Sequence, residues 1–139
     1  MESQNIYSRL EQIAPEVFDK TPVLFAYLFG SHARGIAHGF SDLDIAVYID
    51  TTAIKDTYRL EMNLCMAFDA RLNHEFASDV RTLNTLPVEV VGEVLTFGRL
   101  IYSIDEAARV DFETLARKRY FDFKPVLDEY RRHLIQGIR

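Results

Sequence analysis

Seven consecutive apolar residues, from Val23 to Phe29, limit the fold more than any other feature of the chain. Pro22 precedes this run and Gly30 closes it, and a bounded apolar run of that length predicts a buried strand. Residues 43–49 predict a second strand, because aliphatic side chains there alternate with Asp, Ala and Tyr at a period of two. The chain is therefore expected to build a sheet around these two strands.

The remaining apolar patterns predict helices that alternate with strands. Helices are expected at residues 6–17, 32–37, 54–72, 87–97 and from 105 onward, and two further strands at 77–83 and 99–103. The apolar face of the long central helix is assigned to Ile54, Tyr58, Met62, Cys65 and Leu72. Pro125 is expected to break or kink the last helical stretch, because it lacks an N–H and disfavours helix at the residue before it. This order implies an α+β fold, a mixed sheet of about four strands backed by helices, with a helical C-terminal segment.

Length and charge narrow the class of protein. One domain is expected over residues 1–139, with a core at about 22–103 and C-terminal helices at about 105–137. The chain lacks an apolar stretch of membrane-spanning length, and its polar start does not resemble a signal peptide, so we expect a cytoplasmic protein. The formal net charge of −5 argues against direct nucleic-acid binding. The basic clusters at 117–119 and 131–133 fit a solvated helix face, although a local docking role stays open.

Two carboxylates on the second strand point to a metal ion. Asp42 and Asp44 are two residues apart, so on a strand their side chains share one face. Two neighbouring carboxylates repel each other unless a proton or a cation is shared between them. Oxygen ligands of this kind favour Mg²⁺, which keeps several waters and bridges to substrate phosphates.

The end of the first strand has the features of a phosphate site. Gly30 allows a tight turn, and Ser31 stands where a short helix is expected to begin, with N–H groups and a hydroxyl as donors. Arg34 lies one turn further on and could contact the same anion or pack against the sheet. A phosphate site beside a carboxylate pair predicts a metal–triphosphate site for phosphoryl or nucleotidyl transfer.

These residues resemble the signature of a known superfamily. Gly30-Ser31-His32-Ala33-Arg34-Gly35 followed by Ser41-Asp42-Leu43-Asp44-Ile45 is similar to the motif of DNA polymerase β-type nucleotidyltransferases. The chain resembles in particular the minimal nucleotidyltransferases that are paired with HEPN-domain ribonuclease toxins. The likeness is close over residues 23–49 and looser through Asp79 and residues 98–102.

The resemblance implies a role for each motif residue. Gly30 and Ser31 would hold the phosphates of ATP, and Asp42 and Asp44 would bind two Mg²⁺ ions. Asp79 would be a third carboxylate that touches one metal ion and helps to deprotonate the acceptor. A plain ion pair with Arg81, which shares its strand face, is the competing account of Asp79.

Three functions follow, in order of preference. The resemblance implies an antitoxin that transfers AMP from ATP to a hydroxyl, expected to be a tyrosine, of a HEPN toxin in a hetero-oligomer. The chain could instead neutralise its partner by binding and masking it, with residues 117–139 as a docking surface. Transfer to a small molecule, as in aminoglycoside nucleotidyltransferases, is the third. A zinc role for His32 or His38 is not expected, and Cys65 is assigned to the core beside Met62 and Met66.

Overall fold

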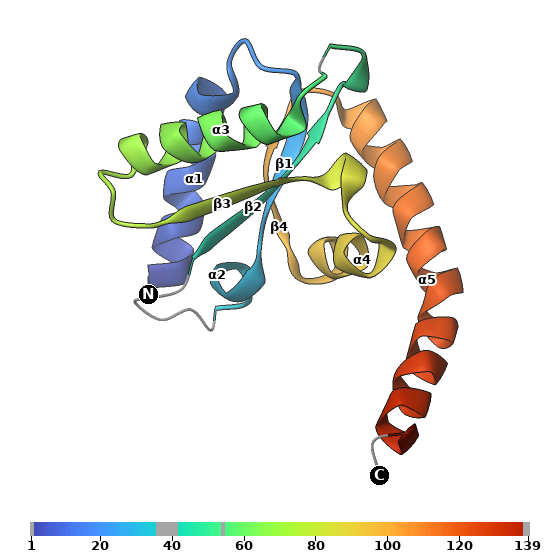
Figure 1. Cartoon of the computed structure of the whole chain (residues 1–139). Coiled ribbons are helices and arrows are strands. Elements are labelled where there is room, and N and C mark those ends of the chain that lie inside the picture. Colours follow the sequence, from blue (N-terminus) through green and yellow to red (C-terminus); the bar gives the residue numbers. More distant parts are fainter. Residues whose placement is uncertain (1, 36–41, 54, 138–139) are drawn as a thin grey trace.

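The computed structural model describes residues 2–35, 42–53 and 55–137, which form a four-stranded mixed sheet with helices on both faces (Figure 1). The strands are β1 (Val23–Phe29), β2 (Leu43–Ile49), β3 (Ser78–Thr82) and β4 (Arg99–Ser103). Their order across the sheet is β3-β2-β1-β4. β1 pairs antiparallel with both β2 and β4, whereas β2 and β3 run parallel.

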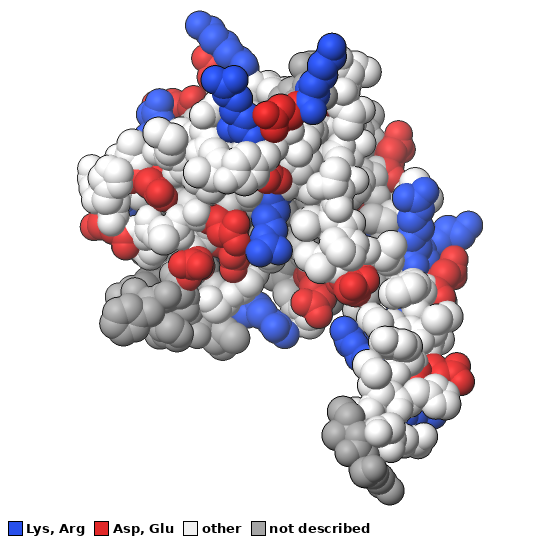
Figure 2. Space-filling view, in the orientation of Figure 1, with Lys and Arg blue, Asp and Glu red and all other residues white. Residues whose placement is uncertain are grey.

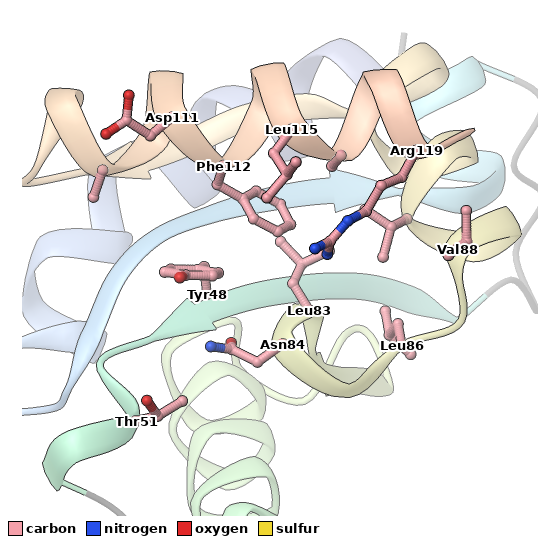
Figure 3. A pocket seen from close by; sticks show the side chains of 13 residues that line it. Tyr48, Thr51, Leu83, Asn84, Leu86, Val88, Asp111, Phe112, Leu115 and Arg119 are labelled. Carbon is pink, nitrogen blue, oxygen red and sulfur yellow. The ribbon is translucent and has the colours of Figure 1, made fainter. Parts of the chain in front are cut away.

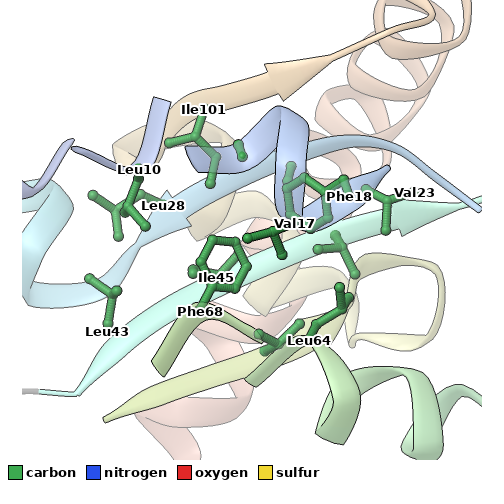
Figure 4. Packing of buried hydrophobic residues seen from close by; sticks show 14 of the residues in the cluster. Leu10, Val17, Phe18, Val23, Leu28, Leu43, Ile45, Leu64, Phe68 and Ile101 are labelled. Atoms are coloured by element: carbon green, nitrogen blue, oxygen red, sulfur yellow. The ribbon is translucent and has the colours of Figure 1, made fainter. Parts of the chain in front are cut away.

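Five α-helices accompany the sheet in the described residues: α1 (Glu2–Phe18), α2 (Gly30–Arg34), α3 (Thr57–Arg71), α4 (Val88–Phe97) and α5 (Glu106–Gly137). Helices α1 and α3 pack on one face, and Figure 4 shows their apolar side chains meeting those of the strands. Helices α4 and α5 pack on the other face through a second apolar cluster. None of the described helices is long and apolar enough to cross a membrane.

The alternation along β2 decides which face receives the carboxylates. Leu43, Ile45 and Val47 belong to the cluster under α1 and α3. The residues between them therefore point to the opposite face, where Ala46 is buried in the cluster under α4 and α5. Asp44 shares this second face with Ala46.

The structure confirms the predicted order of elements and both motif strands, but it corrects the apolar face of α3. Tyr58 is 70% exposed and Met62 is 46% exposed, so the assignment of these two residues is wrong, whereas Leu72 is buried and Cys65 packs against the cluster as expected. Leu64 and Phe68 complete the buried face. Asp56 caps α3 by accepting a hydrogen bond from the N–H of Arg59, so the helix begins at Thr57. Residue 54, the expected start, lies outside the described residues.

The last helix is continuous, so of the break or kink expected at Pro125 the break is wrong. Helix α5 runs from Glu106 to Gly137 with Pro125 inside it, and Figure 1 shows its axis changing direction in the lower part. Pro125 is exposed, and water can therefore bond the carbonyl that the proline leaves without a helical donor. Helix α2 stops at Arg34, because Gly35 adopts a left-handed conformation and its N–H donates to the Ser31 carbonyl. The rest of the segment predicted as helix and turn, residues 36–41, lies outside the described residues.

Candidate active site

Parallel pairing of β2 and β3 brings together carboxylates that are far apart in the sequence. Asp44 stands directly opposite Asp79 in the strand register, and neighbouring strands lie about 4.8 Å apart. Asp42 immediately precedes β2 and is exposed. All three candidate acids therefore lie at the same end of β2.

The electrostatics of Asp44 record this crowding. Burial raises the pKa of Asp44 above its usual range, and the carboxylates of Asp79 and Asp42 raise it further. Arg81 and His32 act in the opposite direction and lower the pKa. The ionised form of Asp44 is thus disfavoured by its surroundings, which is the condition that a bound cation relieves.

Gly30 provides the space into which the Asp44 carboxylate points. A Cβ atom at Gly30 would lie 2.3 Å from Oδ2 of Asp44, closer than two such atoms approach in proteins. The glycine also has a φ of +74°, a conformation that side chains rarely adopt. The register explains the contact, because Phe29 at the end of β1 pairs with Asp44. The candidate phosphate turn and the candidate metal ligand are therefore in direct contact.

Asp79 has one basic neighbour, Arg81, and one acidic neighbour, Asp44. Its Oδ2 lies 3.4 Å from Nε of Arg81, so the ion pair weighed at the sequence level is present. Both side chains are about half exposed, and such pairs contribute little to stability. The pair does not remove Asp79 from the site, since Asp79 still raises the pKa of Asp44. The structure thus places the third candidate acid beside both Asp44 and Arg81.

The remaining motif side chains lie on α2. The guanidinium of Arg34 stacks on the ring of Phe97, with Cζ 4.1 Å from the ring centroid, so α4 holds this arginine at the end of the sheet. Ser31 is half-buried, in the first turn of α2. His32 is buried and packs edge-on against Phe76, at a centroid distance of 5.6 Å.

Some contributors to the site were not evident from the sequence. The influence of Arg81 and His32 on Asp44, and the support that Phe97 gives to Arg34, depend on contacts between distant segments. Of these contacts, the sequence indicated only the one between Arg81 and Asp79, because residues two apart on a β-strand share a face. His38 lies outside the described residues.

The acid groups fit Mg²⁺ when substrate phosphates complete the coordination shell. Among the described residues, no three His, Cys, Asp or Glu side chains form a ready-made metal cluster. Mg²⁺ in nucleotide enzymes is typically held by one or two carboxylates together with phosphate oxygens and water, so a ready-made cluster is not required. Figure 2 shows acidic side chains around a basic one in the middle of the face formed by β3 and α4.

A separate cavity of about 630 Å³ lies on the same face of the sheet, under α5 (Figure 3). Figure 3 shows Tyr48 and Phe112 side by side in its lining, with ring centroids 4.8 Å apart, and Asn84 and Arg119 nearby. Tyr48 is four residues beyond Asp44 along β2, a distance of about 13 Å at 3.3 Å per residue. The cavity is therefore distinct from the carboxylates.

The chain is similar to known proteins in sequence pattern and in fold. Residues 11–107 match the family described as polymerase beta, nucleotidyltransferase. No curated protein sequence matches the chain. A solved toxin–antitoxin structure with AMP-PNP contains a chain that is 20% identical, with a TM-score of 0.68 over 92% of this chain and 97% of that one.

Two further solved complexes resemble the chain. One, from Shewanella oneidensis, is a tri-AMPylated HEPN toxin with its MNT antitoxin, at 17% identity and a TM-score of 0.65 over 95% of this chain and 98% of that one. The other is a MntA–HepT toxin–antitoxin complex, at 17% identity and a TM-score of 0.64 over 94% and 97% of the two chains. At these identities the likeness establishes the shared fold.

Proposed function

The chain belongs to the polymerase beta nucleotidyltransferase family, and on that premise we propose that it transfers AMP from ATP to a hydroxyl group of a partner protein. The observation that carries the proposal is the contact between Gly30 and Asp44 beside Asp79. It joins a turn suited to phosphate with carboxylates suited to a divalent cation.

Each residue has a distinct task in the proposed reaction. Backbone N–H groups at Gly30 and Ser31, with the Ser31 hydroxyl, hold the phosphates of ATP, and Arg34 adds positive charge beside them. Asp42 and Asp44 would hold Mg²⁺, and Asp79 would help to bind one of two ions. When bound, Mg²⁺ would neutralise charge at the phosphates and lower the pKa of the acceptor hydroxyl.

The bond changes follow from the chemistry of nucleotidyl transfer. The acceptor oxygen attacks the α-phosphorus of ATP, and a new phosphorus–oxygen bond forms. The bond from this phosphorus to the bridging oxygen breaks in line, and pyrophosphate leaves. Asp79 takes the proton of the acceptor hydroxyl, because a carboxylate next to the attacking oxygen can act as a general base.

The proposed acceptor is a tyrosine of a HEPN-domain ribonuclease toxin, and the chain would act as its antitoxin in a hetero-oligomer. Support comes from the similar solved structures, which include a HEPN toxin carrying AMP groups in complex with an MNT antitoxin. An AMP group adds negative charge and bulk to the toxin, and it would thereby block an RNA-cleaving site.

The test is a transfer assay with labelled ATP, Mg²⁺ and the product of the neighbouring gene, which the proposal expects to be a HEPN-domain protein. Label is expected on the HEPN protein with the wild type and with Asp19→Asn, which alters an exposed aspartate after α1. Asp44→Asn is expected to lower the transfer rate at least 100-fold, because one ligand charge is lost. Label that persists with Asp44→Asn contradicts the assigned site. If an aminoglycoside added to a parallel assay is labelled and the HEPN protein is not, the acceptor is a small molecule.

Masking without chemistry is the second candidate, favoured by the exposed apolar residues on the last part of α5. Co-expression of the toxin with Asp42→Ala/Asp44→Ala separates the two functions. Growth that depends on intact carboxylates supports adenylylation, whereas full rescue by the double variant supports masking.

A further inference from the structure

The last part of α5, residues 121–137, extends away from the body, and we call this segment the arm (Figure 1). The preceding turns are docked on the domain, since Ala116 is buried in the second cluster. Tyr120 lies against Gly92 of α4, so closely that a Cβ on this glycine would meet the tyrosine ring at 2.2 Å. Within the described residues, the polar contacts of the arm are internal, between Lys124 and Asp128 and between Glu129 and His133.

The apolar stripe that docks α5 continues along the arm. Its members follow one another at intervals of three, four, three and four residues: Tyr120, Phe123, Leu127, Tyr130 and Leu134. This spacing is the heptad pattern by which one helix packs along another. Tyr130 is 61% exposed and Leu134 is 49% exposed, whereas Phe123 and Leu127 are half-buried. Figure 2 shows uncharged surface along the arm between separate acidic and basic groups.

The arm is poorly suited to stand alone as a helix. It is about 25 Å long at 1.5 Å per residue, and helices in proteins owe most of their stability to packing of an apolar face rather than to helix propensity. Pro125 adds a cost of about 3 kcal/mol inside it. Packing against another surface would supply the stabilisation that the segment lacks.

The charges beside the stripe indicate what could cover it. The positions that flank a heptad stripe are occupied by Arg119, Lys124, Val126, Arg131 and His133. Two copies of the arm would oppose basic residues to basic residues in either orientation, which disfavours self-pairing. A helix with an apolar stripe and acidic flanks is complementary to both features.

The arm extends toward the end of the molecule that carries the candidate active site. Figure 1 shows α5 passing α4 and leaving the body at the end of the sheet that carries α2, where Gly30 and Asp44 meet. A protein gripped by the arm would be held at that end of the molecule.

We propose that the arm is the docking site for an amphipathic, acidic-flanked helix of the acceptor protein. This inference rests on the proposed function for the identity of the acceptor. Its chemical basis is the stripe from Tyr120 to Leu134 with its basic flanks.

The test measures the affinity of the whole chain for the HEPN-domain protein by titration calorimetry. Leu134→Glu is expected to weaken binding at least tenfold, because a charge then replaces a buried contact. Ile135→Glu is the matched control, since Ile135 is 67% exposed and lies one position off the stripe. It should change affinity by less than about threefold. Equal effects of the two variants overturn the proposal.

A second pair of variants tests the charge complementarity. Arg131→Glu, on the flank, should weaken binding more at low salt than at high salt. Arg132→Glu, on the outer side of the helix, should have a smaller effect that depends less on salt. Circular dichroism should be used to check that each variant is folded. If the wild type is a dimer in sedimentation equilibrium and Leu134→Glu is a monomer, a second copy of the chain covers the arm and the proposal is wrong.

Failure of the docking proposal differs from failure of the proposed function. Asp44→Asn should bind the HEPN protein as the wild type does while transferring no label. If the wild type binds the HEPN protein through the stripe but transfers no label, the proposed adenylylation is wrong and the docking proposal stands. Transfer by Leu134→Glu with an unchanged KM for the HEPN protein removes docking and leaves adenylylation intact.

Discussion

Substitution of Gly30 by alanine tests the contact on which the proposed site depends. The new Cβ would lie 2.3 Å from Oδ2 and 3.2 Å from Cγ of Asp44. Gly35 offers a matched control, because its φ of +72° is nearly the same and, apart from its neighbours in the chain, no described atom lies within 4 Å of its Cβ position. Both substitutions carry the same backbone penalty, and only Gly30→Ala displaces the carboxylate.

The expected magnitudes follow from these geometries. A side chain in the left-handed region costs about 1–2 kcal/mol, and this cost applies to both Gly30→Ala and Gly35→Ala. Pushing the Asp44 side chain out of its rotamer adds about 0.5–1.5 kcal/mol for Gly30→Ala alone. The change in unfolded-state entropy on replacing glycine is common to both and cancels in the comparison. The free energy of unfolding should therefore fall by about 0.5–1.5 kcal/mol more for Gly30→Ala than for Gly35→Ala.

Urea denaturation of both variants, in the wild-type and Asp44→Ala backgrounds, measures these differences. Asp44→Ala removes the two atoms nearest to the new Cβ, so the excess penalty at Gly30 should disappear in that background. Transfer activity should be lost with Gly30→Ala and retained with Gly35→Ala. Equal penalties at the two glycines, or an excess that survives Asp44→Ala, would refute the reasoning.

Three further predictions concern stability. The raised pKa of Asp44 means that the folded chain holds this proton more tightly than the unfolded chain, so stability is lost as the pH rises from about 3.8 through the raised pKa. Asp44→Asn should thus gain stability relative to wild type as the pH rises above about 4 in urea denaturation, and a constant difference contradicts this. Tyr27→Phe should cost about 1–2 kcal/mol, because the buried tyrosine donates to Glu113 Oε2 at 3.0 Å, and an unchanged urea midpoint contradicts it. Gly92→Ala should lower the thermal midpoint although alanine favours helix, because its Cβ meets the Tyr120 ring at 2.2 Å, and Tyr120→Ala should relieve the loss.

Local patterns predicted the strands because each strand is strongly patterned along its own length. The run from Val23 to Phe29 matches β1, and the alternation after Asp42 matches β2. The face of α3 was misjudged because Tyr58 and Met62 lie at helical spacing with the apolar residues of the segment. The sheet beneath α3 determines which apolar residues of the helix are buried, Phe68 among them, and the sequence of the helix alone does not contain this information.

Pro125 illustrates a different limit of sequence reasoning. The residue lacks an N–H in any setting, but the consequence depends on whether water reaches the carbonyl left without a donor. In the described part of α5 this turn is exposed, and the helix continues through it. The low helix propensity of proline predicts the energetic cost of Pro125, whereas the exposure of this turn to water explains why the helix tolerates it.

The position of Asp79 depends on topology rather than on local pattern. A parallel partner for β2 requires a long crossover, which α3 provides, and the register then sets Asp79 opposite Asp44. An antiparallel hairpin would reverse the strand and change which residue stands opposite Asp44. The crossover also brings Arg81 into the site, since residues two apart on a strand share a face. The ion pair with Arg81 and the proposed role of Asp79 therefore have one structural cause, and the pair can hold the carboxylate at the site until a cation competes for it.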